Sequence, residues 1–140
     1  MSAYDPDNIF AKILRGEIPS TRVYEDDETL AFMDIMPRAD GHLLVIPKTP
    51  CRNVLDATPE QLNAVMATVQ KLARAAKQAF DAGGVTIQQF NEPAGGQVVF
   101  HYHMHVIPRH AGVKLRPHTG EMENGDVLKA NAERLKAALA

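Results

Sequence analysis

The sequence predicts an α+β domain in which one long helix and a few short helices pack against a largely antiparallel sheet of four or five strands. Two observations lead to this fold class. Residues 58–80 repeat apolar side chains at the spacing of an amphipathic helix, whereas shorter segments carry the apolar runs or the alternation typical of strands. The predicted strands are joined mostly by short loops, which favours antiparallel pairing.

The first third of the chain predicts a short helix, a hairpin and a buried strand. Residues 7–19 carry a helical stripe of apolar side chains that Gly16 ends. Residues 21–35 read as two strands around an acidic turn at 25–28. The continuous apolar run in residues 42–48 is typical of a buried strand, and its proline marks the end of that strand.

The long helix has the clearest sequence signals. Thr58 can cap it, Pro59 suits its first turn, and Gln61 completes a capping-box pattern with Thr58. Gly83 and Gly84 are expected to end the helix. Apolar side chains recur along it at spacings of three and four, which predicts one buried face. These side chains are Leu62, Val65, Val69, Leu72, Ala76 and Phe80.

The second half of the chain predicts two further strands and a terminal helix. Residues 85–91 form the first of these strands, and a glycine-rich loop at 92–97 leads into the second at 99–109. After Pro117 the chain is polar until residues 127–140, whose composition predicts a helix.

Composition restricts the classes of protein to which the chain can belong. It has 140 residues, 45% of them hydrophobic, which is enough for a single domain with its own core, placed at residues 1–140. A formal net charge of −2 argues against an extended nucleic-acid surface. A lone cysteine, Cys51, fits a reducing compartment, and neither a signal peptide nor a membrane-spanning run is expected. We therefore expect a cytoplasmic protein without nucleic-acid or membrane partners.

Three histidines alternate along the predicted strand at 99–109, namely His101, His103 and His105. Side chains on a strand alternate between its faces, so the three imidazoles are expected to share one face. Phe100, Tyr102, Met104 and Val106 are expected on the other. A metal site is one interpretation, but same-face positions lie about 6.6 Å apart, so the outer two histidines lie too far apart to converge on one ion easily. His42 and His110 could add ligands, although no acidic residue lies beside the row in the sequence.

Two other interpretations remain for this row of histidines. The residues could satisfy one another in the core, although three in register would be unusual. Alternatively, they could act in phosphoryl chemistry, because a neutral imidazole is a nucleophile and its neighbours can neutralise charge on oxygen. The glycine-rich loop at 94–97 can bring backbone N–H groups close to an anion. These features favour phosphoryl chemistry, and the absence of a Walker-type motif argues against a magnesium-dependent NTPase.

At this point the chain resembles the histidine triad (HIT) family, defined by the pattern His-φ-His-φ-His-φ-φ with φ apolar. Residues 101–107, HYHMHVI, fit every position. Residues 8–48 resemble the N-terminal half of the Hint-type branch, and residues 91–109 resemble its C-terminal signature. The resemblance covers about residues 8–110 and leaves residues 111–140 as a tail and helix. It implies a HIT-like fold with a five-stranded sheet, and a homodimer with one continuous ten-stranded sheet.

The resemblance also implies roles for individual residues. His103 would be the nucleophile that takes the nucleotidyl group, flanked by His101 and His105, with His42 as a fourth histidine and Asp34 on the ribose hydroxyls. The residues that match the apolar purine slot are Ile9, Phe10, Ile13, Phe32 and Ile35, which without the resemblance could equally be ordinary core. Those that match the surroundings of the phosphate are Asn91, Gly96, Gln97 and the backbone N–H of Val98.

Several positions depart from the family pattern. Val98 stands where the Hint branch often has Ser or Thr, so a hydroxyl that could assist the leaving group is missing and turnover of some substrates should be weaker. Pro93 stands where glycine is usual and stiffens the loop that enters the site. Asn8, Ala11 and Pro50 stand where some bacterial members carry zinc ligands. We therefore expect no structural zinc, no catalytic metal and no cofactor.

The resemblance implies a purine-nucleotide-binding enzyme. The expected reaction is metal-independent cleavage of nucleoside phosphoramidates or related phosphate bonds, through a covalent nucleotidyl-His103 intermediate that carries an AMP or GMP moiety. Transfer of the nucleotidyl group to phosphate belongs to the same chemistry. The alternative from another class is a nucleotide-binding adaptor in which catalysis is incidental.

Overall fold

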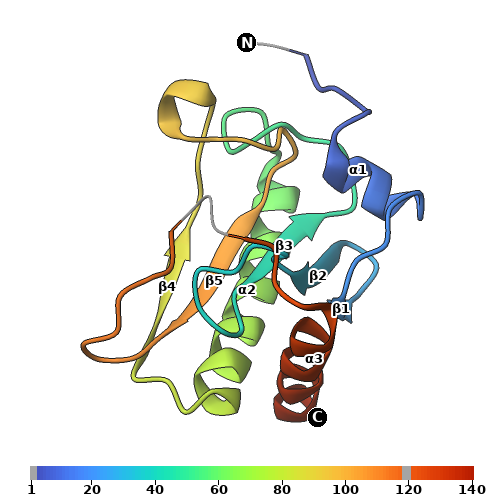
Figure 1. Cartoon of the computed structure of the whole chain (residues 1–140). Coiled ribbons are helices and arrows are strands. Elements are labelled where there is room, and N and C mark those ends of the chain that lie inside the picture. Colours follow the sequence, from blue (N-terminus) through green and yellow to red (C-terminus); the bar gives the residue numbers. More distant parts are fainter. Residues whose placement is uncertain (1–2, 118–120) are drawn as a thin grey trace.

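The computed structural model describes residues 3–117 and 121–140, and within them the chain forms a five-stranded antiparallel sheet with helices on both faces (Figure 1). Residues 1–2 and 118–120, which belong to the predicted single domain and its tail, lie outside the described residues. The elements are α1 (Ile9–Leu14), β1 (Arg22–Glu25), β2 (Thr29–Met33), β3 (Leu43–Pro47), α2 (Pro59–Ala79), β4 (Gly84–Gln88), the 3-10 helix η1 (Pro93–Gly95), β5 (Met104–Arg109) and α3 (Gly125–Leu139). The predicted α+β class is confirmed.

The strands lie in the order β1-β2-β3-β5-β4, and every neighbouring pair is antiparallel. The first three strands follow one another along the chain. β5 then inserts between β3 and β4, because α2 carries the chain over the sheet before β4 begins at its edge. This order places β5 beside β3 in the interior of the sheet, where both strands are buried.

The two faces of the sheet are covered by different elements. α2 and α3 lie side by side against one face, where the main core forms (Figure 1). That core combines sheet residues such as Val45, Met104 and Val106 with Leu72 of α2 and Leu135 of α3. A smaller apolar cluster on the other face joins α1 to the sheet. Its members are Phe10, Ile13, Leu30, Phe32, Leu44 and Ile46.

The predicted beginning of α2 is confirmed, and the helix ends at Ala79, one residue before the last predicted apolar position, but the predicted stop signal is wrong. Thr58 caps the helix, and its capping box with Gln61 is complete. The turn that ends the helix is made by Asp81, which has a φ of 47°, rather than by Gly83 and Gly84. Gly84 instead opens β4. Asp tolerates the left-handed conformation better than most residues with side chains, so a helix can end without glycine at this position.

The strand that carries the histidines begins later than predicted. β5 starts at Met104, so His101 and His103 precede it and only His105 lies within it. The ladder with β3 reaches only from Val106 to Met104. Before that point the backbone N–H of Tyr102 donates instead to the carbonyl oxygen of Cys51, 2.8 Å away. Tyr102, Met104 and Val106 still pack in the main core, so the predicted alternation extends beyond the hydrogen-bonded strand.

The remaining boundaries differ from prediction by a few residues. β2 ends at Met33, before Asp34, and β4 ends at Gln88 rather than at residue 91. α3 begins at Gly125, two residues before the predicted start at 127, because Asn124 caps it through the N–H of Asp126. No helix among the described residues is long and apolar enough to cross a membrane.

Candidate active site

A cavity of ≈ 390 Å³ opens on the α1 face of the sheet. Its wall combines α1, the end of β2, the segment that leads into β3, β5 and the loop that precedes β5. The predicted site residues in this wall are Ile9, Phe10, Ile13, Phe32, Asp34, Ile35, His42, Gly96, Val98, His103 and His105. Residues from these five parts of the chain therefore meet around one space.

One part of this wall, which we call the apolar slot, is formed by the side chains of Ile9, Phe10, Phe32 and Ile35. Phe10 and Phe32 meet edge to face, with ring centroids 5.3 Å apart, and Phe10 makes a similar contact with His103 at 4.9 Å. The side chains of Ile9 and Ile35 are half exposed at the cavity. Apolar groups that stay open to a cavity favour binding of an apolar surface, because the ligand removes them from water.

His103 is held in one tautomer. Its Nδ1 lies 2.7 Å from the backbone carbonyl oxygen of His101, and since a carbonyl can only accept, Nδ1 carries the proton. Burial lowers the pKa of His103, so the ring is neutral near pH 7. A neutral imidazole that is protonated on Nδ1 keeps its lone pair on Nε2. His103 therefore lines the cavity as a neutral imidazole with a lone pair on Nε2, which is the protonation state that nucleophilic attack requires.

His101 is fully buried behind His103 and does not line the cavity. Its Nε2 lies 2.9 Å from the carbonyl oxygen of Pro47, so Nε2 is the protonated nitrogen. Its Nδ1 accepts from the Tyr4 hydroxyl at 2.6 Å. Burial lowers the pKa of His101 to about 4, which keeps the ring neutral. A zinc ion at His101 would have to displace one of these two hydrogen bonds.

His42 and His105 form a second histidine pair across the sheet. The backbone N–H of Arg38 donates to Nδ1 of His42 at 3.0 Å, so the proton of His42 lies on Nε2. That Nε2 lies 2.9 Å from Nδ1 of His105 and 3.4 Å from Oδ2 of Asp34. With Nδ1 as the acceptor, Nε2 of His105 carries a proton. His103 thus offers a lone pair, and the neighbouring His105, with its ring centroid 5.1 Å away, offers an N–H donor.

The same cluster has the composition of a metal site but not the right protonation. Asp34, His42 and His105 each place one ligand atom within 4.8 Å of the others. A neutral imidazole that binds a metal needs a lone pair toward the ion and a proton on its other nitrogen. His42 has the opposite arrangement. Its Nδ1 accepts from the Arg38 N–H, so the proton lies on Nε2, the nitrogen nearest to Asp34 and His105. The described donors therefore suit proton sharing better than metal binding.

The loop before β5 is supported by a buried amide. All four hydrogen-bonding positions of the Gln97 side chain are used: it donates to the carbonyls of Arg52 and Val99 and accepts from Asn53 and from the N–H of Glu92. Glu92 has a φ of 64°, an unusual value for a residue with a side chain. Its carboxylate is held by the Arg52 guanidinium at 2.8 and 2.9 Å, which lowers the pKa of Glu92. The loop is therefore rigidly shaped.

The structure separates the four residues that the resemblance places near the phosphate. Gly96 and Val98 line the cavity, and Gly96 has a φ of 94° that favours glycine. Gln97 supports the loop from behind, and Asn91 binds the Gln89 side chain and the N–H of Val54. Neither Gln97 nor Asn91 belongs to the cavity wall. Their predicted contact with a phosphate remains a prediction.

Sequence reasoning missed several residues of the wall. They are Ile18, Pro19, Ser20, Met33, Met36, Arg38, Leu44, Phe90 and Val99. Arg38 orients His42 through its backbone, so its side-chain type gave no signal. Phe90 packs edge to face on His105 at 5.7 Å, and its place at the end of a predicted strand gave no indication of this contact.

The single cysteine, Cys51, lies outside the cavity wall. Burial raises the pKa of Cys51 to about 12, so its thiol is inert as a nucleophile.

Comparison with known proteins decides the family. The HIT domain family matches residues 15–112, which is most of the chain. The chain belongs to the HIT family. Among curated relatives, Protein hit of Bacillus subtilis is 48% identical over 102 residues, covering 73% of this chain and 70% of that protein. Members of the family are generally nucleotide hydrolases or nucleotidyl transferases, and this HIT protein is of that kind.

Solved structures agree over nearly the whole length. A Hit-like protein from Bartonella henselae, described as involved in cell-cycle regulation and bound to an unknown ligand, superposes with a TM-score of 0.94. It is 52% identical and covers 98% of this HIT protein, which covers 99% of it. A zinc-bound histidine triad family protein from Mycobacterium smegmatis has a TM-score of 0.84 at 37% identity, covering 95% of this chain and 93% of its own.

Proposed function

We propose that this HIT protein cleaves nucleoside phosphoramidates or related nucleotidyl bonds through a covalent nucleotidyl-His103 intermediate. The observation that carries the proposal is the hydrogen bond from Nδ1 of His103 to the carbonyl oxygen of His101. It leaves the lone pair on Nε2 of a buried, neutral ring in the wall of a cavity that suits a nucleotide. A histidine that is both oriented and deprotonated at the reacting nitrogen needs no further base to attack phosphorus.

The reaction would follow two displacements. In the first, Nε2 of His103 attacks phosphorus, the bond from phosphorus to the leaving nitrogen or oxygen breaks, and the leaving group departs with the electron pair. The N–H of His105 would bind or protonate a phosphate or leaving-group atom, and His42 would replace that proton through its hydrogen bond to Nδ1 of His105. In the second, water attacks phosphorus, the bond from phosphorus to Nε2 of His103 breaks, and one proton of the water returns to the His42–His105 pair; the nucleoside monophosphate and neutral His103 are released.

The wall supports a nucleotide as the group transferred. The slot around Phe10 and Phe32 offers an apolar surface to a purine. Asp34 lies beside it, and a carboxylate can accept two hydrogen bonds from a ribose diol. The name of a relative points the same way: Adenylylsulfatase HINT3 of Arabidopsis thaliana is 36% identical over 108 residues, covering 77% of this chain and 55% of that protein. We therefore propose an AMP or GMP moiety.

The proposal includes the setting in which the protein works. We place it in the cytoplasm as a homodimer with a continuous ten-stranded sheet, as the family resemblance implies, and we assign it no cofactor and no metal. It would act on a small nucleotide, with neither nucleic acid nor a membrane as partner. Chemical cross-linking or light scattering of the purified protein tests the dimer directly.

The position of Val98 keeps a second candidate function open. Its side chain is 72% exposed at the cavity and cannot assist a leaving group. If the chemical step is slow for every substrate for this reason, the protein would act as a nucleotide-binding adaptor. The site would then be occupied by a nucleotide, and its turnover would be incidental.

A substrate panel separates the two functions. Turnover is measured on adenosine and guanosine phosphoramidates, on the corresponding sulfates and on dinucleoside polyphosphates, with the wild type and with His103→Asn. Acid quench during turnover, followed by mass spectrometry of the peptide that contains residues 99–109, should show a nucleotidyl adduct on His103. Inversion at a chiral phosphorus would indicate direct attack by water and contradict the intermediate. Tight binding of the monophosphate with negligible turnover throughout would favour the adaptor.

A further inference from the structure

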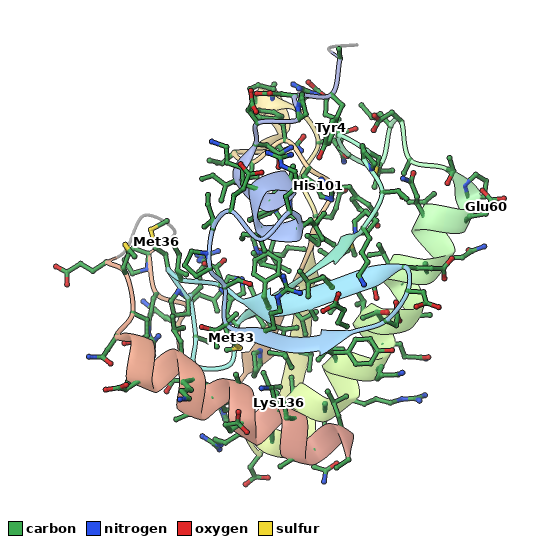
Figure 2. The ribbon with its side chains drawn as sticks, turned by 90° about the vertical axis from the view of Figure 1, so that its right-hand side faces the viewer. Tyr4, Met33, Met36, Glu60, His101 and Lys136 are labelled. Atoms are coloured by element: carbon green, nitrogen blue, oxygen red, sulfur yellow. The ribbon has the colours of Figure 1, made fainter. Side chains whose placement is uncertain are left out.

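The N-terminal arm, residues 3–8, lies before the part of the chain that matches the family and yet reaches the histidine row. The Tyr4 hydroxyl lies 2.6 Å from Nδ1 of His101, and the two rings meet edge to face with centroids 5.7 Å apart. Figure 2 shows Tyr4 and His101 close together, at the opposite end of the molecule from Lys136 of α3. Since Nε2 of His101 is the donor to Pro47, the tyrosine must be the donor to Nδ1.

The arm is fixed to α1 rather than loosely attached. The Arg15 guanidinium donates to the carbonyl oxygen of Pro6 at 2.7 Å, and the Asn8 side-chain amide donates to that of Asp5 at 2.7 Å. The side-chain oxygen of Asn8 also caps α1. Two residues further, Phe10 of α1 touches the ring of His103. Tyr4 is therefore presented to His101 by a segment that is itself positioned against the nucleophile.

We propose that Tyr4 is a positioning residue for His103, acting through the two hydrogen bonds of the His101 ring and the carbonyl oxygen of the same residue. The ring of His101 is held at two points, by Tyr4 at Nδ1 and by Pro47 at Nε2. The backbone of the same residue supplies the carbonyl oxygen that accepts from His103. Two anchors fix both the position and the plane of an imidazole, and so they fix the peptide that orients the nucleophile.

The consequence of losing one anchor follows from burial. His101 is fully buried, so a lone pair on Nδ1 without a donor is costly. The ring can then pivot about its remaining bond to Pro47, or water can enter beside it. Either change moves the His101 carbonyl oxygen relative to His103. Misplacing a reacting group slows the chemical step without weakening contacts to the bound substrate.

The test compares Tyr4→Phe with a matched control, Tyr24→Phe. Both substitutions remove one hydroxyl, but Tyr24 on β1 binds Asp26 and Lys71, away from the cavity wall. Tyr4→Phe should lower kcat by about tenfold at unchanged KM, less than the roughly hundredfold cost of misplacing a reacting group by about 1 Å. Tyr24→Phe should leave both constants at the wild-type value. A purely structural role of Tyr4 would instead lower the fraction of active protein or change KM together with kcat.

A second readout does not depend on turnover, so it remains valid if the proposed function, on which the kinetic comparison rests, is wrong. The Nδ1 proton of His103 can be followed by NMR of protein labelled with ¹⁵N at histidine. In Tyr4→Phe this proton should exchange with water at least several times faster than in the wild type and in Tyr24→Phe. Unchanged exchange together with unchanged kcat would overturn the proposal. Wild-type protein without turnover on any substrate, but with faster exchange in Tyr4→Phe, would overturn only the proposed function.

Discussion

On the face of the sheet covered by α2 and α3, Tyr102, Met104 and Val106 pack into a core of aliphatic side chains. On the opposite face, His103 and His105 line a cavity together with Asp34. The two histidines alternate with the three core residues along one stretch of chain, and all five side chains are buried. The core residues are held by non-directional van der Waals packing, whereas the histidines are held by directional hydrogen bonds.

The comparison shows how one strand can serve stability and chemistry at once. Packed side chains tolerate small shifts, because many weak contacts share the change. Each imidazole, by contrast, depends on one or two partners that fix its tautomer. Substitutions on the core face should therefore change the free energy of unfolding, whereas substitutions on the cavity face should change rates and affinities. The following predictions test this separation, from the largest expected effect to the smallest.

His103→Asn should give the sharpest loss of function. The variant removes the nucleophile, so turnover should fall more than about a thousandfold. Binding of the product monophosphate should remain close to that of the wild type, because the proposed base and ribose contacts are with α1 and Asp34, which line the cavity beside His103. Calorimetry with the monophosphate, beside a kinetic assay, measures both quantities. A variant that keeps a tenth of the wild-type rate would contradict the assignment of His103.

Leu72→Ala should show the opposite pattern. Leu72 of α2 is fully buried in the main core, and its truncation should cost about 2–5 kcal/mol of the free energy of unfolding. Urea unfolding followed by circular dichroism measures this change. The rate per folded molecule should stay near the wild-type value, since Leu72 does not line the cavity. A large loss of specific activity in the folded fraction would show that the two faces are coupled.

Acid should destabilise the protein through His101, which is buried behind the cavity wall. The pKa of His101 is lowered to about 4, below the unfolded value of about 6.5, because burial disfavours the charged ring. The stability present above pH 6.5 is lost as the pH falls toward 4, since the unfolded chain takes up the proton first. The loss from this residue should reach about 3 kcal/mol. Between pH 7.5 and 4.5, the urea midpoint should fall more steeply for the wild type than for His101→Gln. Parallel falls in the two proteins would show that His101 is not the source of the pH dependence.

Asp34→Ala should weaken nucleotide binding with dependence on the sugar. A hydrogen bond to a charged group contributes about 1.5–3 kcal/mol, so affinity for a ribonucleoside monophosphate should fall about tenfold or more. The matched deoxyribonucleotide lacks one of the two hydroxyls and should lose less affinity. Titration of both ligands into both proteins measures the difference. Equal losses for the two sugars would mean that Asp34 acts on His42 rather than on ribose.

The sequence predicted the parts of the fold that depend on local patterns. The capping box at Thr58, the helical stripe around Phe10 and the alternation around Met104 all rest on spacing within one segment, and the structure confirms them. The turn at Asp81 that follows α2 was missed because glycine is the usual signal there. The late start of β5 was missed because the backbone N–H of Tyr102 pairs with Cys51 instead of with β3, and no local pattern indicates this change of partner.

The composition of the cavity followed largely from the family resemblance, but its hydrogen bonding could not be predicted. The donor to His42 is a backbone N–H, which every residue except proline would supply. The donor to His101 comes from Tyr4, 97 residues away in the sequence. No periodicity links two such positions. Contacts of this kind appear only when the chain is folded, and in this site they set which nitrogen carries the proton.

The register of β5 limits where this gene can gain or lose codons. His105 lies opposite both Leu44 of β3 and Gln88 of β4. Insertion or deletion of one residue between His103 and Val106 would shift the segment by one position, turning histidines into the hydrocarbon core and aliphatic side chains into the cavity. A change of length among residues 93–96, on the exposed part of the loop, leaves that alternation intact. The alternation of side chains therefore restricts changes of length between His103 and Val106 but not among residues 93–96.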